Sequence, residues 1–192
     1  MKKSLVAAGV IIALGVVWTG GAWYTGKQLE SRIADMVQQA NAQLQSSAPQ
    51  AGVELTYQDY QRGLFSSRLQ LVLKPIAGKA PRWLAAGQSL VFDEVVDHGP
   101  FPLASLKSFN LAPAMASVKT TLVNNEASKS LFDIAKGETP FTIDTRIAYS
   151  GDNQSAIVLK PLDYAKDDEK VTFSGGQFQL NADREGKTLS LS

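Results

Sequence analysis

The 192-residue sequence lacks cysteine and contains a single histidine, His98. Without cysteine, the chain cannot form disulfide scaffolds, thiolate metal sites, lipoprotein anchors or cysteine nucleophiles. One histidine excludes a zinc site built on two histidines and leaves one candidate base for a serine triad. No Gly-x-Ser-x-Gly elbow is present to supply the nucleophile. We therefore expect a protein that is not an enzyme and that needs no cofactor.

An excess of one charge is also lacking. Lysine and arginine total 19, aspartate and glutamate total 18, and the formal net charge is +1. Such a chain has no electrostatic field that would gather nucleic acid, so we expect no nucleic-acid partner. Its length is sufficient for one domain with a real core.

The amino terminus carries the strongest pattern in the chain. A basic start over residues 1–3 is followed by an uncharged run over residues 4–25, whose apolar centre is Leu5 to Val17. As a helix at about 1.5 Å per residue, this run covers the hydrocarbon thickness of a bilayer. Aromatic rings, which favour the membrane interface, gather at its far end: Trp18, Trp23 and Tyr24. We expect residues 1–3 to be a cytoplasmic tip and residues 4–25 a transmembrane anchor.

A cleaved signal peptide is the alternative reading of the same run. Near the end of the apolar core, only Gly20 and Ala22 form a small-residue pair, and no Ala-x-Ala tripeptide follows. This pattern favours a retained signal-anchor. A basic start before an apolar core also favours a cytoplasmic amino terminus, which places the rest of the chain outside the cytoplasm.

Residues 27–47 have the spacing of an amphipathic juxtamembrane helix. Its apolar stripe is a possible helix contact face and consists of Leu29, Ile33, Met36, Val37, Ala40 and Leu44. The opposite face carries Glu30, Gln38, Asn41 and Gln45. We expect the stripe to pack on the chain's own sheet, and a short coiled-coil contact is the alternative. Small residues in the apolar run, such as Gly9 and Ala13, also leave homo-oligomerisation open.

From residue 53 onward the apolar residues alternate with polar ones, which predicts β-strands. The expected strands cover residues 53–57, 65–73, 89–97, 117–123, 141–149, 155–164, 171–173, 178–182 and 187–192. We interpret Gly175 and Gly176 as a bulge that restores the apolar face. Asn125 is expected to cap one short helix that contains Leu131, Phe132 and Ile134.

These patterns predict an α+β fold that is mainly β. A transmembrane helix continues into the amphipathic helix, and an antiparallel meander sheet with one short helix follows. The β-rich domain spans residues 53–192. Because the sequence ends inside an expected strand, we expect this domain to be incomplete at its carboxyl terminus, with missing strands covering its edge.

The segment His98, Gly99, Pro100, Phe101 and Pro102 stands out as a possible structural or family motif. We expect the imidazole to be hydrogen-bonded within a rigid turn. Nearby, strand alternation sends Asp93 and Asp97 to one face and Glu94 to the other. We interpret all three carboxylates as solvated, and we predict no catalytic, cofactor or metal site.

The segments KKSLVAAGVIIALGVVWTGGAWYTG, YQRGLFSSRLQL, HGPFPL and TLVNN with KGETPF closely resemble the amino-terminal portion of a YdgA-like family. This is a bacterial inner-membrane and periplasmic family of unknown function. The resemblance covers essentially the whole chain. It implies an inner-membrane anchor and a large periplasmic region in a Gram-negative bacterium, with longer family members. It supplies no catalytic residues.

Two functions compete on these grounds. The favoured one is a non-catalytic binding or scaffold module of the cell envelope, whose partners are the membrane and an envelope protein or lipid. The alternative is a lipid-binding or lipid-transfer module in which a curved sheet exposes its apolar face as a groove. A self-packed core predicts contacts of the helix stripe, or of one another, for Leu69, Leu71, Phe141, Ile143 and Phe178.

Overall fold

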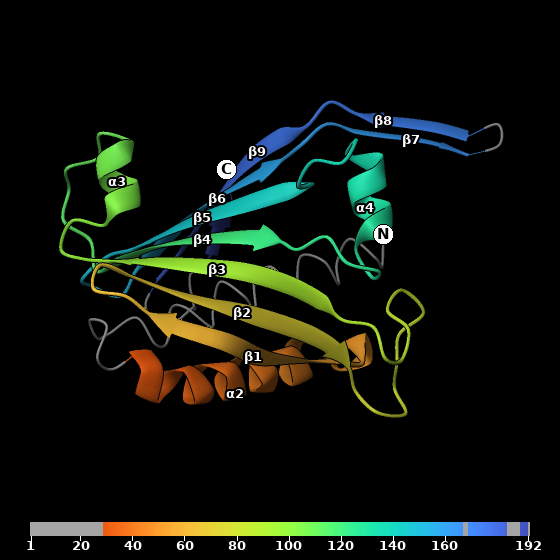
Figure 1. Cartoon of the computed structure of the whole chain (residues 1–192), viewed down its shortest axis with the longest axis horizontal. Helices are drawn as coiled ribbons and strands as arrows, with labels where there is room; N and C mark the ends of the chain where they lie inside the picture. The colour runs from red at the N-terminus through yellow and green to blue at the C-terminus, as the bar shows by residue number, and fades with distance from the viewer. Residues whose placement is uncertain (1–28, 167–168, 184–188, 192) are drawn as a thin grey trace.

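A long antiparallel sheet with one long helix along its edge forms the body of the molecule (Figure 1). The computed structural model describes residues 29–166, 169–183 and 189–191. The strands are β1 (Val53–Arg62), β2 (Ser66–Pro75), β3 (Leu90–His98), β4 (Ala116–Leu122), β5 (Phe141–Ile147), β6 (Asn153–Leu159), β7 (Leu162–Lys166), β8 (Glu169–Phe173), β9 (Gly176–Ala182) and β10 (Leu189–Leu191). The main sheet has the order β1-β2-β3-β4-β5-β6-β9-β10, and β7 and β8 form a separate hairpin. The predicted antiparallel meander is confirmed.

The helices are α2 (Leu29–Ser47), the short 3-10 helix η1 (Pro49–Ala51), α3 (Leu103–Lys107) and α4 (Lys129–Ile134). Helix α2 matches the predicted amphipathic helix, and α4 matches the predicted short helix. The cap of α4 is Ser128 rather than Asn125, whose side-chain oxygen instead accepts a hydrogen bond from the Ser128 N–H at 3.1 Å. Helix α3 was not predicted, because the prolines around it favoured an irregular loop.

The predicted cytoplasmic tip over residues 1–3 and the predicted anchor over residues 4–25 lie outside the described residues. Within residues 29–191 as described, no helix is both long enough and apolar enough to cross a bilayer.

Two details of the strand prediction are wrong. The expected strand over residues 155–164 is broken after Leu159, and the chain enters the separate hairpin beyond Pro161. A proline cannot donate to the sheet ladder, so it suits such a boundary. Gly175 is no bulge within a strand but the crossing from β8 into β9, where a side-chain Cβ would lie only 2.9 Å from the Leu159 carbonyl oxygen.

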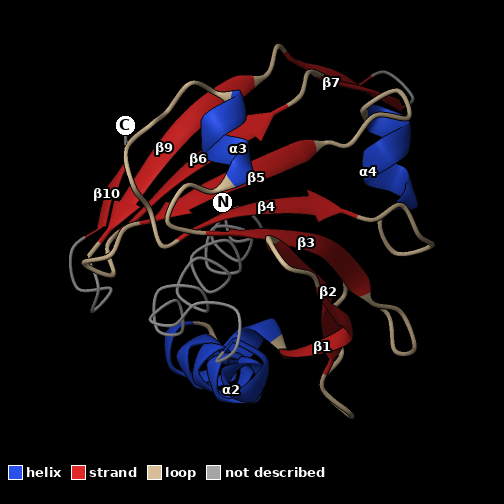
Figure 2. Ribbon diagram, turned by 60° about the vertical axis from the view of Figure 1, so that its left-hand side comes forward, coloured by secondary structure: helices blue, strands red, loops and turns tan. Residues whose placement is uncertain are grey.

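The core lies between α2 and the inner face of the sheet, which arches over the side on which α2 lies (Figure 2). Because side chains alternate along a strand, every second residue of each strand faces this inner side. Helix α2 contributes its apolar stripe to the same core. The buried stripe residues are Ile33, Met36, Val37, Ala40 and Leu44, and they cluster with Leu55, Leu71, Leu73 and Phe92 of the sheet. Each fully buried side chain of this size contributes about 1.5–3 kcal/mol. The helix therefore packs on the chain's own sheet, and this use of the stripe leaves no coiled-coil seam on its described part.

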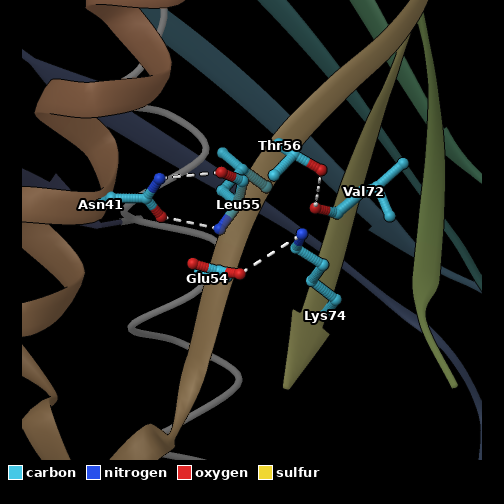
Figure 3. Close-up of polar contacts among 6 residues, drawn as sticks. All are labelled: Asn41, Glu54, Leu55, Thr56, Val72 and Lys74. Carbon is cyan, nitrogen blue, oxygen red and sulfur yellow. Dashed lines mark hydrogen bonds and ion pairs between the residues drawn. The ribbon is translucent and has the colours of Figure 1, made fainter. Parts of the chain in front are cut away.

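Asn41 joins α2 to the free edge of the sheet (Figure 3). Its side-chain nitrogen donates to the Leu55 carbonyl oxygen at 2.8 Å, and its side-chain oxygen accepts from the Leu55 N–H at 2.6 Å. Strand β1 is the first strand of the sheet, so this N–H and this carbonyl have no neighbouring strand to pair with. The expectation that Asn41 lies on the solvent face is therefore wrong: it borders the stripe and completes the edge.

Replacing Asn41 by alanine should lower the free energy of unfolding by about 1–2 kcal/mol, even though alanine favours the helix. The loss arises because a backbone donor and acceptor next to the core lose their partner. Denaturant unfolding of the chain in detergent, followed by circular dichroism, measures the change. Gln45→Ala, on the exposed face of the same helix, is the control and should change stability by much less. Equal losses in the two variants would contradict the edge-closing role.

Candidate functional site

The predicted motif at residues 98–102 forms the turn by which the chain leaves β3. The His98 N–H donates to the Phe65 carbonyl oxygen at 2.8 Å, and Nε2 of the imidazole lies 2.9 Å from Oγ of Ser67. Ser67 is completely buried at the start of β2. The single histidine therefore links the end of β3 to the start of β2, whereas the sequence predicted a hydrogen bond within its own turn. No local pattern marks Ser67 as the partner of His98, because only strand pairing brings its hydroxyl to the imidazole.

Gly99 follows the histidine at a point where the backbone is crowded. Its N–H donates to the Met115 carbonyl oxygen at 2.7 Å, and the bond to Pro100 is cis. A Cβ at Gly99 would overlap the Ala114 carbonyl oxygen and would lie 2.7 Å from that of Met115. Only glycine fits this close approach.

The rest of the motif orients the loop that follows. A carboxylate oxygen of Asp97 accepts a hydrogen bond from the Ala104 N–H at 2.8 Å, in the first turn of α3. Pro102 is fully buried, whereas Phe101 is about half exposed. The segment thus fixes the direction in which the loop between β3 and β4 projects.

The Ser67–His98 pair has the separation of a nucleophile and its base but lacks the rest of a triad. Ser67 is inaccessible to a substrate, and alternation sends Asp97 to the opposite face of β3, where it binds the Ala104 N–H. In the part of the chain that the structure describes, no group of three or more histidine, aspartate or glutamate side chains is placed to hold a metal ion. The geometry supports a structural pair.

Glu94 is the one buried carboxylate among the described residues. It faces inward from β3 and accepts a hydrogen bond from Oγ1 of Thr120, at 2.7 Å, through Oε2, while its Oε1 has no hydrogen-bond partner among the described residues. Burial raises the pKa of Glu94 well above its usual value and the negative charge of Asp93 adds to the rise, whereas the Thr120 hydrogen bond opposes it. The interpretation of Glu94 as solvated is wrong. Its position between Phe92 and Val96, on the apolar parity of the strand, was the signal for its burial.

A second polar pair continues this row across the inner face of the sheet. Oγ1 of Thr145 lies 2.8 Å from Oγ of Ser155, and both residues are buried. Strand register places Thr120 opposite Glu94, and Ser155 opposite Thr145. The inner face is therefore apolar beside α2 and mixed in polarity farther along the sheet.

The outer face of β5, β6 and β9 carries a shallow polar hollow of about 190 Å³. Its lining residues are Asp144, Arg146, Gln154, Ser155, Ala156, Gln179 and Asn181. The guanidinium of Arg146 donates to the carbonyl oxygens of Ala112 and Pro113 at 3.2 and 2.9 Å, so it also holds the loop before β4. The hollow offers hydrogen bonds but no pair of groups suited to acid–base or nucleophilic chemistry.

Replacing Gly99 by alanine should destabilise the fold by about 3 kcal/mol, because the added Cβ overlaps backbone oxygens that cannot move independently of the sheet. Gly78→Ala is the matched control: Gly78 has a φ of +75° but open space around it. The control should cost only about 1 kcal/mol from backbone strain. Thermal and denaturant unfolding of the two variants tests the difference, and a Gly99→Ala chain as stable as the control would contradict the close approach.

Replacing Glu94 by glutamine should change how stability depends on pH. In the wild type the folded state holds the carboxyl proton more tightly than the unfolded chain, so the free energy of unfolding falls as pH rises above about 4.5, the usual value. The slope is at most about 1.4 kcal/mol per pH unit. Glu94→Gln should abolish this decline and gain stability relative to the wild type between pH 5 and pH 8, which unfolding curves across that range measure.

The control for this prediction is Asp144→Asn, which removes an exposed carboxylate from the outer face of β5. A decline with pH that is unchanged in Glu94→Gln would show that the buried carboxyl is not its source. An equal effect of both variants would assign the decline to general charge rather than to burial.

Comparison with known proteins identifies relatives of this chain by sequence. Protein YdgA of Escherichia coli (strain K12) is 68% identical over 192 residues, which are 100% of this chain and 38% of that protein. The uncharacterised protein YihF of the same strain is 36% identical over 190 residues, 99% of this chain and 38% of that protein. An uncharacterised protein of Haemophilus influenzae (strain ATCC 51907 / DSM 11121 / KW20 / Rd) is 30% identical over 185 residues, 95% of this chain and 49% of that protein.

The chain therefore spans less than half the length of each of these relatives. None of their names states an activity, a ligand or a partner. No solved structure matches the chain. The model of a bacterial protein family of unknown function, DUF945, matches residues 1–192, which confirms the YdgA-like resemblance of the sequence. The chain belongs to the DUF945 family of bacterial proteins of unknown function.

Proposed function

We propose that this chain is the membrane-proximal part of a single-pass inner-membrane protein, with its β-rich domain in the periplasm as a non-catalytic binding or scaffold module of the envelope. The position of α2 is the main observation that supports this proposal. This helix begins at Leu29, a few residues after the predicted anchor over residues 4–25, and its stripe forms one wall of the core. Only residues 26–28 separate the predicted anchor from α2 in sequence, so the sheet on which α2 packs would lie near the membrane.

The groups that could carry chemistry support a non-catalytic role. Ser67, which contacts the half-buried His98 imidazole, is buried, and Glu94 is buried on the inner face. The hollow on the outer face of β5, β6 and β9, which the described residues line, contains neither Ser67 nor Glu94. The inner face instead uses its polar groups to join neighbouring strands.

A lipid-binding or lipid-transfer module is the second candidate function. Leu69 and Leu71 lie in the core with the α2 stripe, and Phe141 packs against it, which supports a self-packed core in the first half of the sheet. Farther along, Phe178 of β9 faces the inner side opposite Ile157 and remains 37% exposed. That exposed aromatic side chain favours an apolar ligand on the far half of the inner face.

A fusion experiment tests membrane topology. Alkaline phosphatase, which is active only outside the cytoplasm, is placed after residue 192 of the whole chain in a Gram-negative host. We expect an active reporter that stays in the membrane fraction after carbonate extraction. Ile12→Arg, which places a charge in the middle of the predicted span at a cost of about 2.5–3.5 kcal/mol, should reduce membrane retention. An inactive reporter, or a wild-type chain extracted by carbonate, would overturn the proposal.

The purified chain then distinguishes the two candidate functions. Native mass spectrometry from mild detergent measures bound phospholipid in the wild type and in Phe178→Asp, with Val171→Asp on the β8 hairpin as the exposed control. Lipid near one per chain that is lost only in Phe178→Asp would favour the lipid module. A wild-type chain without bound lipid would favour the scaffold.

A further inference from the structure

Exposed apolar side chains gather in two loops that we call the apolar loop end: residues 63–65 between β1 and β2, and residues 99–115 between β3 and β4. The four most exposed large apolar side chains of the described chain all belong to it: Phe109 at 92%, Leu64 at 84%, Leu111 at 70% and Phe65 at 65%. Phe101, Leu103 and Leu106 of the second loop are also exposed. Apolar side chains this exposed, in two adjoining loops, indicate a contact surface rather than ordinary solvent exposure.

The two loops lie at the same end of the sheet. In an antiparallel meander the turn after β1 and the turn after β3 fall on one side, and the His98 N–H ties them together through the Phe65 carbonyl oxygen. The exposed Tyr149, in the turn after β5, falls on this side as well. Helix α4 and the β7–β8 hairpin lie at the opposite end (Figure 1).

Helix α2 also begins at this end. It runs antiparallel to β1, and Asn41 holds the two together. A helix of 19 residues is about 29 Å long, and a strand of 10 residues about 33 Å, so the start of α2 lies beside the end of β1. Figure 1 shows the first turn of α2 and the tip of β1 on the same side.

This geometry brings the apolar loop end close to the membrane. Residues 26–28 separate the predicted anchor from α2, and even fully extended they span only about 10 Å. The loops also carry a positive charge, which complements an anionic lipid surface. Over residues 62–66 and 99–115, the charged side chains are Arg62 and Lys107, with no acidic residue.

We propose that the apolar loop end inserts into the periplasmic surface of the membrane that the anchor spans. The inference rests on the proposed function for the anchor. Phenylalanine and leucine side chains enter the boundary between headgroups and acyl chains, while Arg62 and Lys107 contact anionic headgroups. The domain is then held at its anchor and at its loops, which directs α4 and the β7–β8 hairpin away from the bilayer.

Single cysteines report the insertion cleanly, because the natural chain has none. Phe109→Cys and Leu64→Cys are labelled with an environment-sensitive fluorophore in the whole chain. Leu131→Cys on α4 is the control at the far end, and its natural side chain is 39% exposed, as is that of Leu106 in the apolar loop end. The labelled chains are reconstituted into vesicles of phosphatidylethanolamine and phosphatidylglycerol that contain a nitroxide lipid quencher. We expect several-fold stronger quenching at positions 109 and 64 than at position 131.

Equal quenching at all three positions, in chains that float with the vesicles, would overturn the insertion while leaving the anchor intact. Strong quenching at positions 109 and 64 in chains that carbonate nevertheless extracts would support the insertion and overturn the anchor. Chains that do not float would overturn both. A pyrene label at position 109 that gives excimer emission without lipid quenching would assign the apolar loop end to a contact between two copies, and it too would overturn the insertion.

Discussion

Helix α2 closes the first edge of the sheet and covers its apolar face. A single sheet buries its apolar face only if another layer covers it, and an open edge strand leaves a row of unpaired backbone groups. Helix α2 meets both needs, because its stripe fills the inner face beside β1 to β3 and Asn41 pairs with Leu55 on the edge. The strands that follow can then pair in chain order, each beside the one before it as far as β6.

Polar groups on the inner face need hydrogen-bond partners within the protein, because burial removes their hydration. Glu94 receives one hydrogen bond from Thr120, and its second oxygen receives none among the described residues. The protein therefore favours the neutral carboxyl. Ser67 with His98, and Thr145 with Ser155, avoid this cost by pairing across strands. These pairs fix strand register where the apolar pattern is weak.

The two ends of the sheet differ in a way that gives the molecule a direction. One end holds the start of α2, the His98 turn and the most exposed apolar side chains. The other holds α4 and the β7–β8 hairpin. The crowding at Gly99 and the Asp97 contact with Ala104 orient the long loop between β3 and β4. These local contacts therefore determine where the exposed apolar side chains of that loop lie. The high identity to Protein YdgA over this whole chain extends these features as expectations to that relative.

Periodicity was enough to predict most of the elements. The stripe from Ile33 to Leu44 repeats at helical spacing and the residues after 53 alternate, so α2, the antiparallel strands and α4 follow from the sequence alone. The family also follows from sequence, because its motifs extend over the whole chain. Local patterns carry this information since each reflects only which side of an element faces the core.

The pairing of polar groups, in contrast, depends on how the strands and the helix come together in space. Ser67 and His98 are separated by 31 positions in sequence and Asn41 and Leu55 by 14, and nothing in either local pattern marks them as partners. The crossing at Gly175 likewise depends on what lies across the sheet, where the Leu159 carbonyl oxygen approaches it. Local apolar patterns are enough to specify the elements and the faces that they bury, whereas register and curvature specify the polar contacts, because those contacts join residues distant along the chain.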